Sequence, residues 1–313
     1  MKSHKPVYLS SWSVHDLILK GKLKLSHFPQ FCLERGFDGC ELNDTLLTRL
    51  NSDELLQLEN QIKHLAPGVS LAVTNDFTLP APDQLAQQVS LVKKHLELAH
   101  QLTASIVRIY VGGKHRLVRK LWQQPAVEIS PRGKKQPTTS WRQRLWKWSM
   151  HNRFRGIRQL LNDYLLAQQR LTPVLLNQLV QKIQEILPLA QQLQIGLVIE
   201  NHGGFSSKAE NLIKIVQQVD SDFLGLCPDF GNFLPTQDRY QALQKMMPYA
   251  LNIHAKSYAF NTEGKETSID YQRCFEIINA ANYQGPVVVE FEGTGDPIFN
   301  SLQTLKSIRK YYQ

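Results

Sequence analysis

Short apolar runs alternate with longer amphipathic stretches along most of this chain. Runs of strand length, rich in β-branched and other apolar residues, recur at regular intervals. They predict strands over 7–13, 37–43, 70–77, 105–112, 195–202, 224–232, 250–258 and 285–293. Between most of these runs, apolar residues recur at helical spacing.

The predicted helices cover 52–64, 83–102, 173–193 and 209–219, among others. In the first of them we expect Ser52 to be the N-cap, ahead of an acidic first turn. Strands that alternate with helices predict a parallel sheet, and eight such units in 313 residues predict a (β/α)8 TIM barrel. An open doubly wound sheet is the rival, but no GxGxxG or GxxxxGK[ST] motif follows the first strand.

The alternation breaks after the fourth strand, over about 113–172. The centre of this stretch, SPRGKKQP at 130–137, has the composition of a loop. A Trp-rich segment follows at 141–148, and then a helix-like stretch to about Arg170. Because its first half holds few aliphatic residues, the stretch would bury little core of its own. We therefore predict one barrel domain over 1–313 with a basic, Trp-rich insertion.

Composition indicates an ordinary globular protein, with 42% hydrophobic and 20% charged residues. No apolar run is long enough to predict a membrane-spanning helix, and the N-terminus enters the first strand without an apolar signal-peptide region. Four widely separated cysteines without CxxC spacing predict neither a disulfide framework nor a Cys-rich zinc site. A reducing cytoplasm is the predicted location.

The net charge of +9 belongs to one segment. Residues 114–158 carry thirteen Lys or Arg and one acid, Glu128, so the rest of the chain has a charge of −3. Three interpretations stay open for this segment. It is a solvated excursion, or its interleaved tryptophans and cations bind a membrane surface or another anionic partner, which would place the protein peripherally at the membrane. Nucleic-acid binding is the least favoured of the three.

Acids and a histidine stand where four consecutive predicted strands end. Glu200 and Glu290 each follow an apolar run directly, and Asp229 and His254 lie at the ends of the two strands between them. The C-terminal strand ends of such a barrel meet over its mouth, and a buried carboxylate is costly unless it is paired or metal-bound. These residues therefore predict a divalent-metal site. The alternatives are rim salt bridges for the glutamates, a helix cap for Asp229 and a satisfied core histidine for His254.

Several short motifs resemble those of the xylose isomerase-like barrels. They are GFDGCE at 36–41, IENH at 199–202, DFGN at 229–232, HAK at 254–256 and GPVVVE at 285–290. This superfamily includes sugar and sugar-phosphate isomerases and epimerases, inosose dehydratases and endonuclease IV-type enzymes. The resemblance covers nearly the whole chain apart from the insertion. It implies that Glu200, Asp229, His254 and Glu290 are metal ligands and that the two glutamates also move a substrate proton. Asn232 departs from the pattern, because many relatives have a His there.

The donor types agree with that implication. Three carboxylates and one imidazole favour Mn²⁺, Mg²⁺ or Co²⁺, with Zn²⁺ as a second choice. We therefore expect a metal-dependent isomerase or epimerase of a small sugar or sugar-like hydroxy-carbonyl compound, in which the metal polarises the carbonyl and a glutamate removes the neighbouring proton. Lys256, on the same side of its strand as His254, is a third catalytic candidate or a rim salt bridge.

Three further residues are candidates for binding the substrate. Glu41 ends the second strand and either binds substrate or orders the barrel mouth. Of Asn201 and His202, one is expected to face the site, and we favour His202. Arg108 lies inside the fourth strand, where it reaches an anionic substrate group or, the favoured alternative, pairs with a core acid.

Other functions compete with the isomerase. A dehydratase of the same fold would use the same metal and proton abstraction. An endonuclease IV-like enzyme needs a multi-metal cluster, for which the chain's ten His, with His115 the nearest candidate past strand four, offer little. A non-catalytic barrel tethered to a membrane through the insertion is the third alternative.

Overall fold

The computed structural model describes residues 5–112, 170–234 and 237–312. Residues 113–169, which form most of the predicted insertion, lie outside the described residues. So do His115 and the basic segment 114–158 that was expected to meet a membrane, another anionic partner or nucleic acid.

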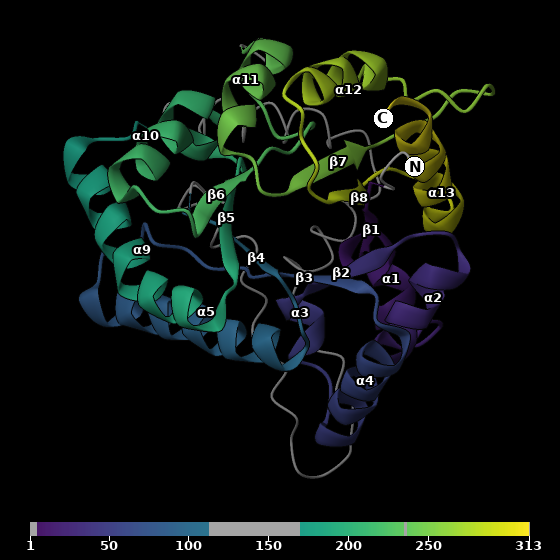
Figure 1. The fold of residues 1–313 in the computed structure, drawn as a ribbon, viewed down its shortest axis with the longest axis horizontal. Coiled ribbons are helices and arrows are strands. Elements are labelled where there is room, and N and C mark those ends of the chain that lie inside the picture. Colours follow the sequence, from purple (N-terminus) through teal and green to yellow (C-terminus); the bar gives the residue numbers. More distant parts are fainter. Residues whose placement is uncertain (1–4, 113–169, 235–236, 313) are drawn as a thin grey trace, which may run out of the picture.

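Eight parallel strands form one sheet that closes into a barrel with helices around it (Figure 1). The strands are β1 (Val7–Ser10), β2 (Gly39–Asn43), β3 (Gly68–Ala72), β4 (Ile106–Ile109), β5 (Gly196–Glu200), β6 (Leu224–Cys227), β7 (Ile253–Ser257) and β8 (Val287–Phe291). Their order is β6-β5-β4-β3-β2-β1-β8-β7. The (β/α)8 barrel predicted from the alternation of strands and helices is confirmed.

The barrel closes between β6 and β7 through isolated bridges rather than a continuous ladder. Leu226 pairs with Ala250, and Asp229 pairs with His254. The His254 amide donates to the Pro228 carbonyl at 3.0 Å, and the Phe230 amide donates to the His254 carbonyl at 3.1 Å. The seam of the barrel therefore joins two of the predicted metal ligands through their backbones.

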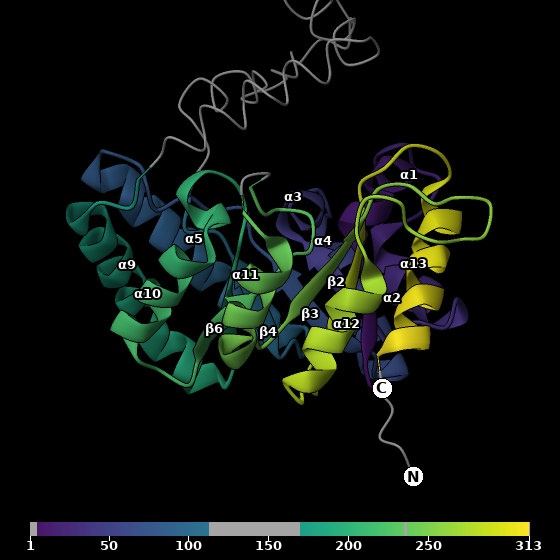
Figure 2. The ribbon, with the colours of Figure 1, turned by 90° about the horizontal axis from the view of Figure 1, so that it is seen from above.

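Helices surround the barrel, as Figure 2 shows from a second direction. The α-helices are α1 (His15–Leu19), α2 (Phe28–Glu34), α3 (Asp44–Leu47), α4 (Ser52–Leu65), α5 (Pro82–Gln101), α9 (Pro173–Leu193), α10 (Ala209–Val219), α11 (Arg239–Met246), α12 (Tyr271–Ala280) and α13 (Pro297–Tyr311). Short 3₁₀ turns are η1 (Ser11–Val14), η2 (Leu25–His27), η3 (Gly204–Ser207) and η4 (Met247–Tyr249). No helix of the described residues is long and apolar enough to cross a membrane.

The predicted elements match the observed ones closely, with three corrections. Seven of the eight predicted strands contain an observed one, and the observed strands are shorter, as β5 shows by ending at Glu200 rather than at residue 202. The strand predicted over 70–77 is displaced, because β3 runs from Gly68 to Ala72 and overlaps the prediction only at 70–72. Ser52 is not the cap of α4. Asn51 is, in a capping box with Glu54, and Ser52 is the first helical residue.

The barrel interior changes from apolar to ionic toward the C-terminal ends of the strands. Ile106, Val198 and Cys227 form a small apolar cluster, separate from the large core between sheet and helices. Two residues further along their strands, where side chains point to the same face again, lie Arg108 and Glu200. The buried polar residues of this upper layer are Ser10, Glu41, Arg108, Glu200, Asp229, His254, Lys256 and Glu290.

Candidate metal centre

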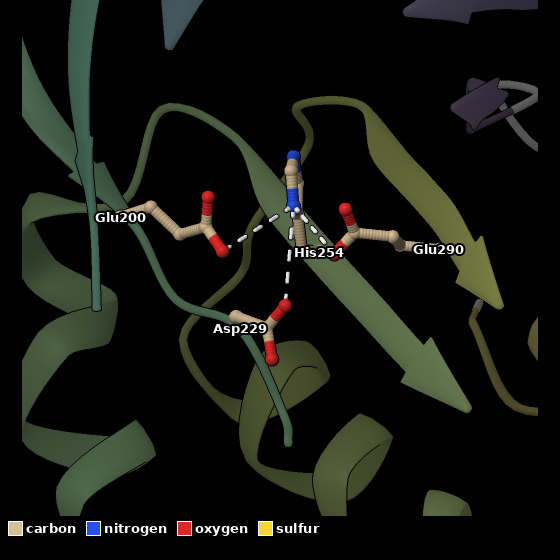
Figure 3. A group of neighbouring side chains, drawn as sticks. All are labelled: Glu200, Asp229, His254 and Glu290. Carbon is tan, nitrogen blue, oxygen red and sulfur yellow. Dashed lines mark ion pairs between the residues drawn. The ribbon is translucent and has the colours of Figure 1, made fainter. Parts of the chain in front are cut away.

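Four side chains from β5, β7, β8 and the segment after β6 converge in the upper layer (Figure 3). Glu200 and Glu290 approach His254 from opposite sides, and Asp229 approaches from a third direction. Each offers one ligand atom, and these atoms all lie within 4.8 Å of one another. All four residues are buried. The structure therefore brings together the four residues that the sequence predicted as metal ligands.

His254 is the centre of this arrangement. Its Nδ1 lies 3.5 Å from Glu290 Oε2, 3.9 Å from Glu200 Oε1 and 4.0 Å from Asp229 Oδ2. Its other nitrogen, Nε2, faces away from these acids and contacts Glu41 Oε2 at 2.9 Å. The ring thus has one nitrogen among three carboxylates and one nitrogen engaged elsewhere.

Asp229 uses its two oxygens differently. Oδ1 accepts hydrogen bonds from the amides of Gly231 and Asn232, at 2.7 Å and 3.0 Å, and so organises the turn that follows. Oδ2 lies toward the cluster and is buried without a hydrogen-bond partner among the described residues. The helix cap considered as the alternative for Asp229 is wrong, because Asp238 caps the next helix, α11. Asp229 instead uses one oxygen in the turn and leaves the other oxygen for an ion.

Glu200 is held by two residues that belong to different parts of the barrel. Arg108, from β4, places its Nε 3.1 Å from Glu200 Oε2, and the side chains of both residues are 1% exposed. Asn232 donates from Nδ2 to Glu200 Oε1 at 2.8 Å. The Arg108 guanidinium also stacks over the Tyr110 ring, 4.2 Å from its centroid. The core-acid pairing that the sequence favoured for Arg108 is what the structure contains.

Lys256 brings a second buried cation to the cluster. Its Nζ contacts Glu290 Oε2 at 2.5 Å, Glu292 Oε2 at 3.2 Å and Asp229 Oδ2 at 3.5 Å. The Glu292 side chain is 38% exposed, and its Oε1 accepts from Trp12 Nε1 at 2.8 Å. Lys256 therefore links two of the candidate ligands to a solvent-accessible carboxylate at the rim.

Burial and mutual charge set the ionisation of the cluster. Burial raises the pKa of Glu200 above its usual value despite the nearby Arg108. Burial also raises the pKa of Asp229. For Glu290, the attraction of Lys256 and His254 outweighs burial and holds the pKa well below its usual value. Similarly, burial opposes the charge of Lys256, but Asp229, Glu290 and Glu292 hold its pKa well above 10.5.

The donor atoms fit a hard or intermediate divalent cation. His254 Nδ1 and Asp229 Oδ2 are buried 4.0 Å apart, and neither has a hydrogen-bond partner in the described part of the chain. Buried polar atoms without hydrogen bonds cost free energy, and although the ion-pair contact with Lys256 offsets part of this cost for Oδ2, a bound cation would satisfy both atoms. Burial raises the pKa of the neighbouring Cys227 thiol to about 12, so it stays protonated and does not offer a thiolate. One imidazole and three carboxylates remain, a set suited to Mn²⁺, Mg²⁺ or Co²⁺.

The remaining predicted residues lie around the cluster. His202 is partly exposed and packs against the Tyr110 ring at 4.4 Å between centroids. Asn201 is buried, and its side chain bonds both backbone groups of Asp229, so it is the member of this pair that packs. Glu41 is buried under His254. The substrate-binding roles expected for His202, Arg108 and Glu41 stay predictions.

Sequence reasoning missed three residues that the structure places at this site. Ser10 donates to Glu41 Oε1 at 3.0 Å, and Glu292 and Trp12 bond each other at the rim. A signal was present for Glu292, because it lies two residues after Glu290 and thus on the same face of the chain. Ser10 ends β1 directly opposite Glu41 in the strand register, which only the paired sheet makes visible.

Comparison with known proteins supports the resemblance first drawn from the motifs. The model of a family described as xylose isomerase-like TIM barrel matches residues 158–311, a range that contains all four candidate ligands. No curated protein sequence matches the chain.

Solved structures of the same fold include several epimerases. The 3-keto-D-glucoside 4-epimerase from E. coli is 13% identical with a TM-score of 0.66, over 98% of this chain and 100% of that one. The D-psicose 3-epimerase from Clostridium cellulolyticum H10, solved with D-tagatose, is 12% identical with a TM-score of 0.63, over 93% and 94% of the two chains. A xylose isomerase-like TIM barrel protein from Mycobacterium smegmatis, in complex with magnesium, is 16% identical with a TM-score of 0.63, over 99% and 98%. At these identities the likeness shows the fold.

Proposed function

We propose that this xylose isomerase-like barrel is a divalent-metal-dependent epimerase or isomerase of a small sugar or a related hydroxy-carbonyl compound. One observation carries the proposal. Two buried glutamates face each other across a histidine nitrogen, and an aspartate completes a set of donors within 4.8 Å. The epimerases of the same fold, one of them solved with a sugar, and the relative that holds magnesium support this choice of reaction and cofactor.

Glu200, Asp229, His254 and Glu290 would hold the cation. When bound, a divalent metal polarises a substrate carbonyl and acidifies the adjacent C–H group. The chain's own residues then have three tasks, which are to bind the substrate at the mouth, to exclude water from the buried layer and to move one proton.

Glu200 and Glu290 are the residues that would move this proton. Because they lie on opposite sides of His254, a carbon held between them presents one face to each carboxylate. Removal of a proton from one face by one glutamate, and delivery of a proton to the opposite face by the other glutamate in its protonated form, inverts that carbon. Delivery of a proton to the neighbouring carbon, together with transfer of a proton from the hydroxyl oxygen to the former carbonyl oxygen, gives the isomer instead.

Lys256 would have two roles, one on the ionisation of Glu290 and the other on the charge of the reacting substrate oxygens. Its contact of 2.5 Å keeps a positive charge next to a carboxylate that must accept or lose a proton. Negative charge that develops on a substrate oxygen is also stabilised by a nearby fixed ammonium group. Glu292 is exposed and His202 and Asn232 are partly exposed, so we expect these three residues to bind sugar hydroxyls.

The test combines metal content with isotope exchange. Wild-type protein purified without chelator is expected to hold about one equivalent of a divalent metal, and both Glu200→Gln and His254→Ala should lose most of it. Ketoses, keto-sugars and their phosphates are then incubated with the metal-loaded enzyme in D₂O and followed by NMR. The expected result is one solvent deuteron at the carbon beside the carbonyl, together with a product epimer or isomer. Loss of a hydroxyl without such a product would indicate a dehydratase, and absence of bound metal after reconstitution would refute the proposal.

A further inference from the structure

Glu41 reaches His254 from the other half of the barrel. Its strand, β2, is separated from β7 by β1 and β8 in the sheet, so the two side chains meet across the barrel interior. Glu41 Oε2 lies 2.9 Å from His254 Nε2, and both side chains are completely buried. Glu41 Oε1 accepts from the Ser10 hydroxyl at 3.0 Å. Both oxygens of Glu41 are therefore engaged, and neither faces solvent.

This contact determines which nitrogen of His254 is available to an ion. An ionised carboxylate accepts hydrogen bonds and cannot donate one, so the proton of the 2.9 Å contact belongs to Nε2. In a neutral imidazole only one nitrogen carries a proton, and the free electron pair is then at Nδ1. Nδ1 is the nitrogen that lies 3.5–4.0 Å from the three acids and has no hydrogen-bond partner among the described residues.

The same contact fixes the plane of the ring. A histidine side chain without a second partner rotates about its terminal torsion angle, which is broad in the absence of constraints. Glu41 is held in turn by Ser10, which lies opposite it in the register of β1 and β2. The chain Ser10–Glu41–His254 thus carries the rigidity of the sheet into the orientation of the Nδ1 electron pair. Metal-binding histidines are commonly oriented in this way by a carboxylate on the far nitrogen.

We propose that Glu41 is a positioning residue for the metal site rather than a substrate contact, and that it acts by holding the Nε2–H tautomer and the ring plane of His254. The inference rests on the proposed function, because it takes the cluster to be a metal site. A substrate hydroxyl could reach Glu41 only by displacing either Ser10 or His254 from a fully buried position.

The first measurement is metal affinity, made on four variants beside the wild type. Glu41→Ala removes the acceptor and is expected to raise the dissociation constant for Co²⁺ or Mn²⁺ by about 10- to 100-fold. Glu41→Gln keeps an amide oxygen that can accept from Nε2–H, so we expect a smaller increase. Ser10→Ala keeps the acceptor for Nε2–H but removes the hydroxyl that holds Glu41, so its increase is expected to be smaller than that of Glu41→Ala.

A fourth variant controls for general loss of stability. Glu266 is another buried carboxylate, and it accepts hydrogen bonds from four backbone amides in the loop between β7 and α12. Glu266→Gln should lower the melting temperature without a matching change in metal affinity. If destabilisation alone explained the Glu41 variants, then Glu266→Gln would weaken metal binding as well.

The second measurement reads the contact itself in the metal-free protein. With ¹⁵N-labelled histidine, the Nε2–H of His254 should give a slowly exchanging ring N–H signal that disappears in both His254→Asn and Glu41→Ala. Wild-type affinity in Glu41→Ala would overturn the positioning role and leave the proposed function standing. Conversely, a wild type that binds metal but exchanges no sugar proton would refute the proposed function, while the metal affinities of the Glu41 variants would still decide whether Glu41 positions His254. A wild type that binds no metal would overturn both.

Discussion

The two halves of this barrel contribute to the same buried layer in different ways. β5–β8 and their loops supply the four candidate donors and Lys256. β1–β4 supply Glu41 and Arg108, which contact donors without joining them, and Ser10, which holds Glu41. The family model matches 158–311, which contains β5–β8 and none of β1–β4. A metal ion accepts few residue types as donors, while the task of holding a donor can be met by many hydrogen-bonding or charged groups. The half that provides donors is therefore the half whose motifs are easier to recognise.

The largest expected effect comes from removing a proton-transfer group of the C-terminal half. Glu290→Gln should lower kcat/KM for deuterium exchange by about 10³-fold, since positioned general acids and bases contribute on this scale. Glu97→Gln, at an exposed position of α5, is the matched control and should leave the rate unchanged. Steady-state exchange in D₂O followed by NMR measures both. A Glu290→Gln enzyme within about threefold of the wild type would remove Glu290 from the chemistry.

Removal of Arg108, the residue of the N-terminal half that pairs with the candidate ligand Glu200, should mainly lower the free energy of unfolding. Arg108→Met leaves the Glu200 carboxylate buried beside an apolar side chain, and breaking a buried ion pair in this way costs about 3 kcal/mol. Urea unfolding of the metal-free protein measures this free energy. The double variant Arg108→Met/Glu200→Gln removes the uncompensated charge and should recover much of the loss. If the single and double variants were equally unstable, the ion pair would not be the cause.

Two asparagines offer a matched comparison between the halves. Asn201 bonds the amide and the carbonyl of Asp229, at 2.6 Å and 3.0 Å, and so ties the end of β5 to the segment after β6. Asn75 bonds the amide and the carbonyl of Tyr110, at 2.8 Å and 2.6 Å, and ties the end of β3 to the end of β4. Both side chains are buried. The two residues therefore perform the same structural task, one on a candidate donor and the other on a residue that is not a donor.

We expect Asn201→Ala and Asn75→Ala each to lower the free energy of unfolding by about 1–2 kcal/mol, because two buried backbone groups lose their partners. Metal affinity should separate them. Asn201→Ala should weaken it several-fold through the displaced Asp229, and Asn75→Ala should leave it close to that of the wild type. Equal losses of affinity in the two variants would show that the site responds to overall stability rather than to the position of Asp229.

The sequence was sufficient to predict the strand–helix alternation and the four converging residues. Both predictions follow from local rules. The spacing of apolar residues along the chain predicts whether a segment is a strand or a helix, and burying a carboxylate at the end of an apolar strand costs free energy unless the carboxylate has a partner. The contact between Glu41 and His254 could not be predicted, because it joins positions 213 residues apart through the closure of the barrel. The sequence alone also could not predict that one carboxylate oxygen of Asp229 forms a turn while the other faces the cluster, because these roles depend on the positions of individual atoms.

The smallest expected effect lies far from the site, at the start of α4 in the N-terminal half. Asn51 Oδ1 accepts from the Glu54 amide at 2.9 Å, and Glu54 Oε2 accepts from the Asn51 amide at 3.1 Å. Asn51→Ala removes the side-chain cap and should destabilise the protein by about 1 kcal/mol, whereas Ser52→Ala, at the first helical position, should have almost no effect. Urea unfolding measures both, and metal affinity should equal that of the wild type in each. A weaker metal affinity in Asn51→Ala would mean that the N-terminal half influences the donors through its general stability. The specific contacts of Glu41 and Arg108 would then not be needed to explain the effect of that half on metal binding.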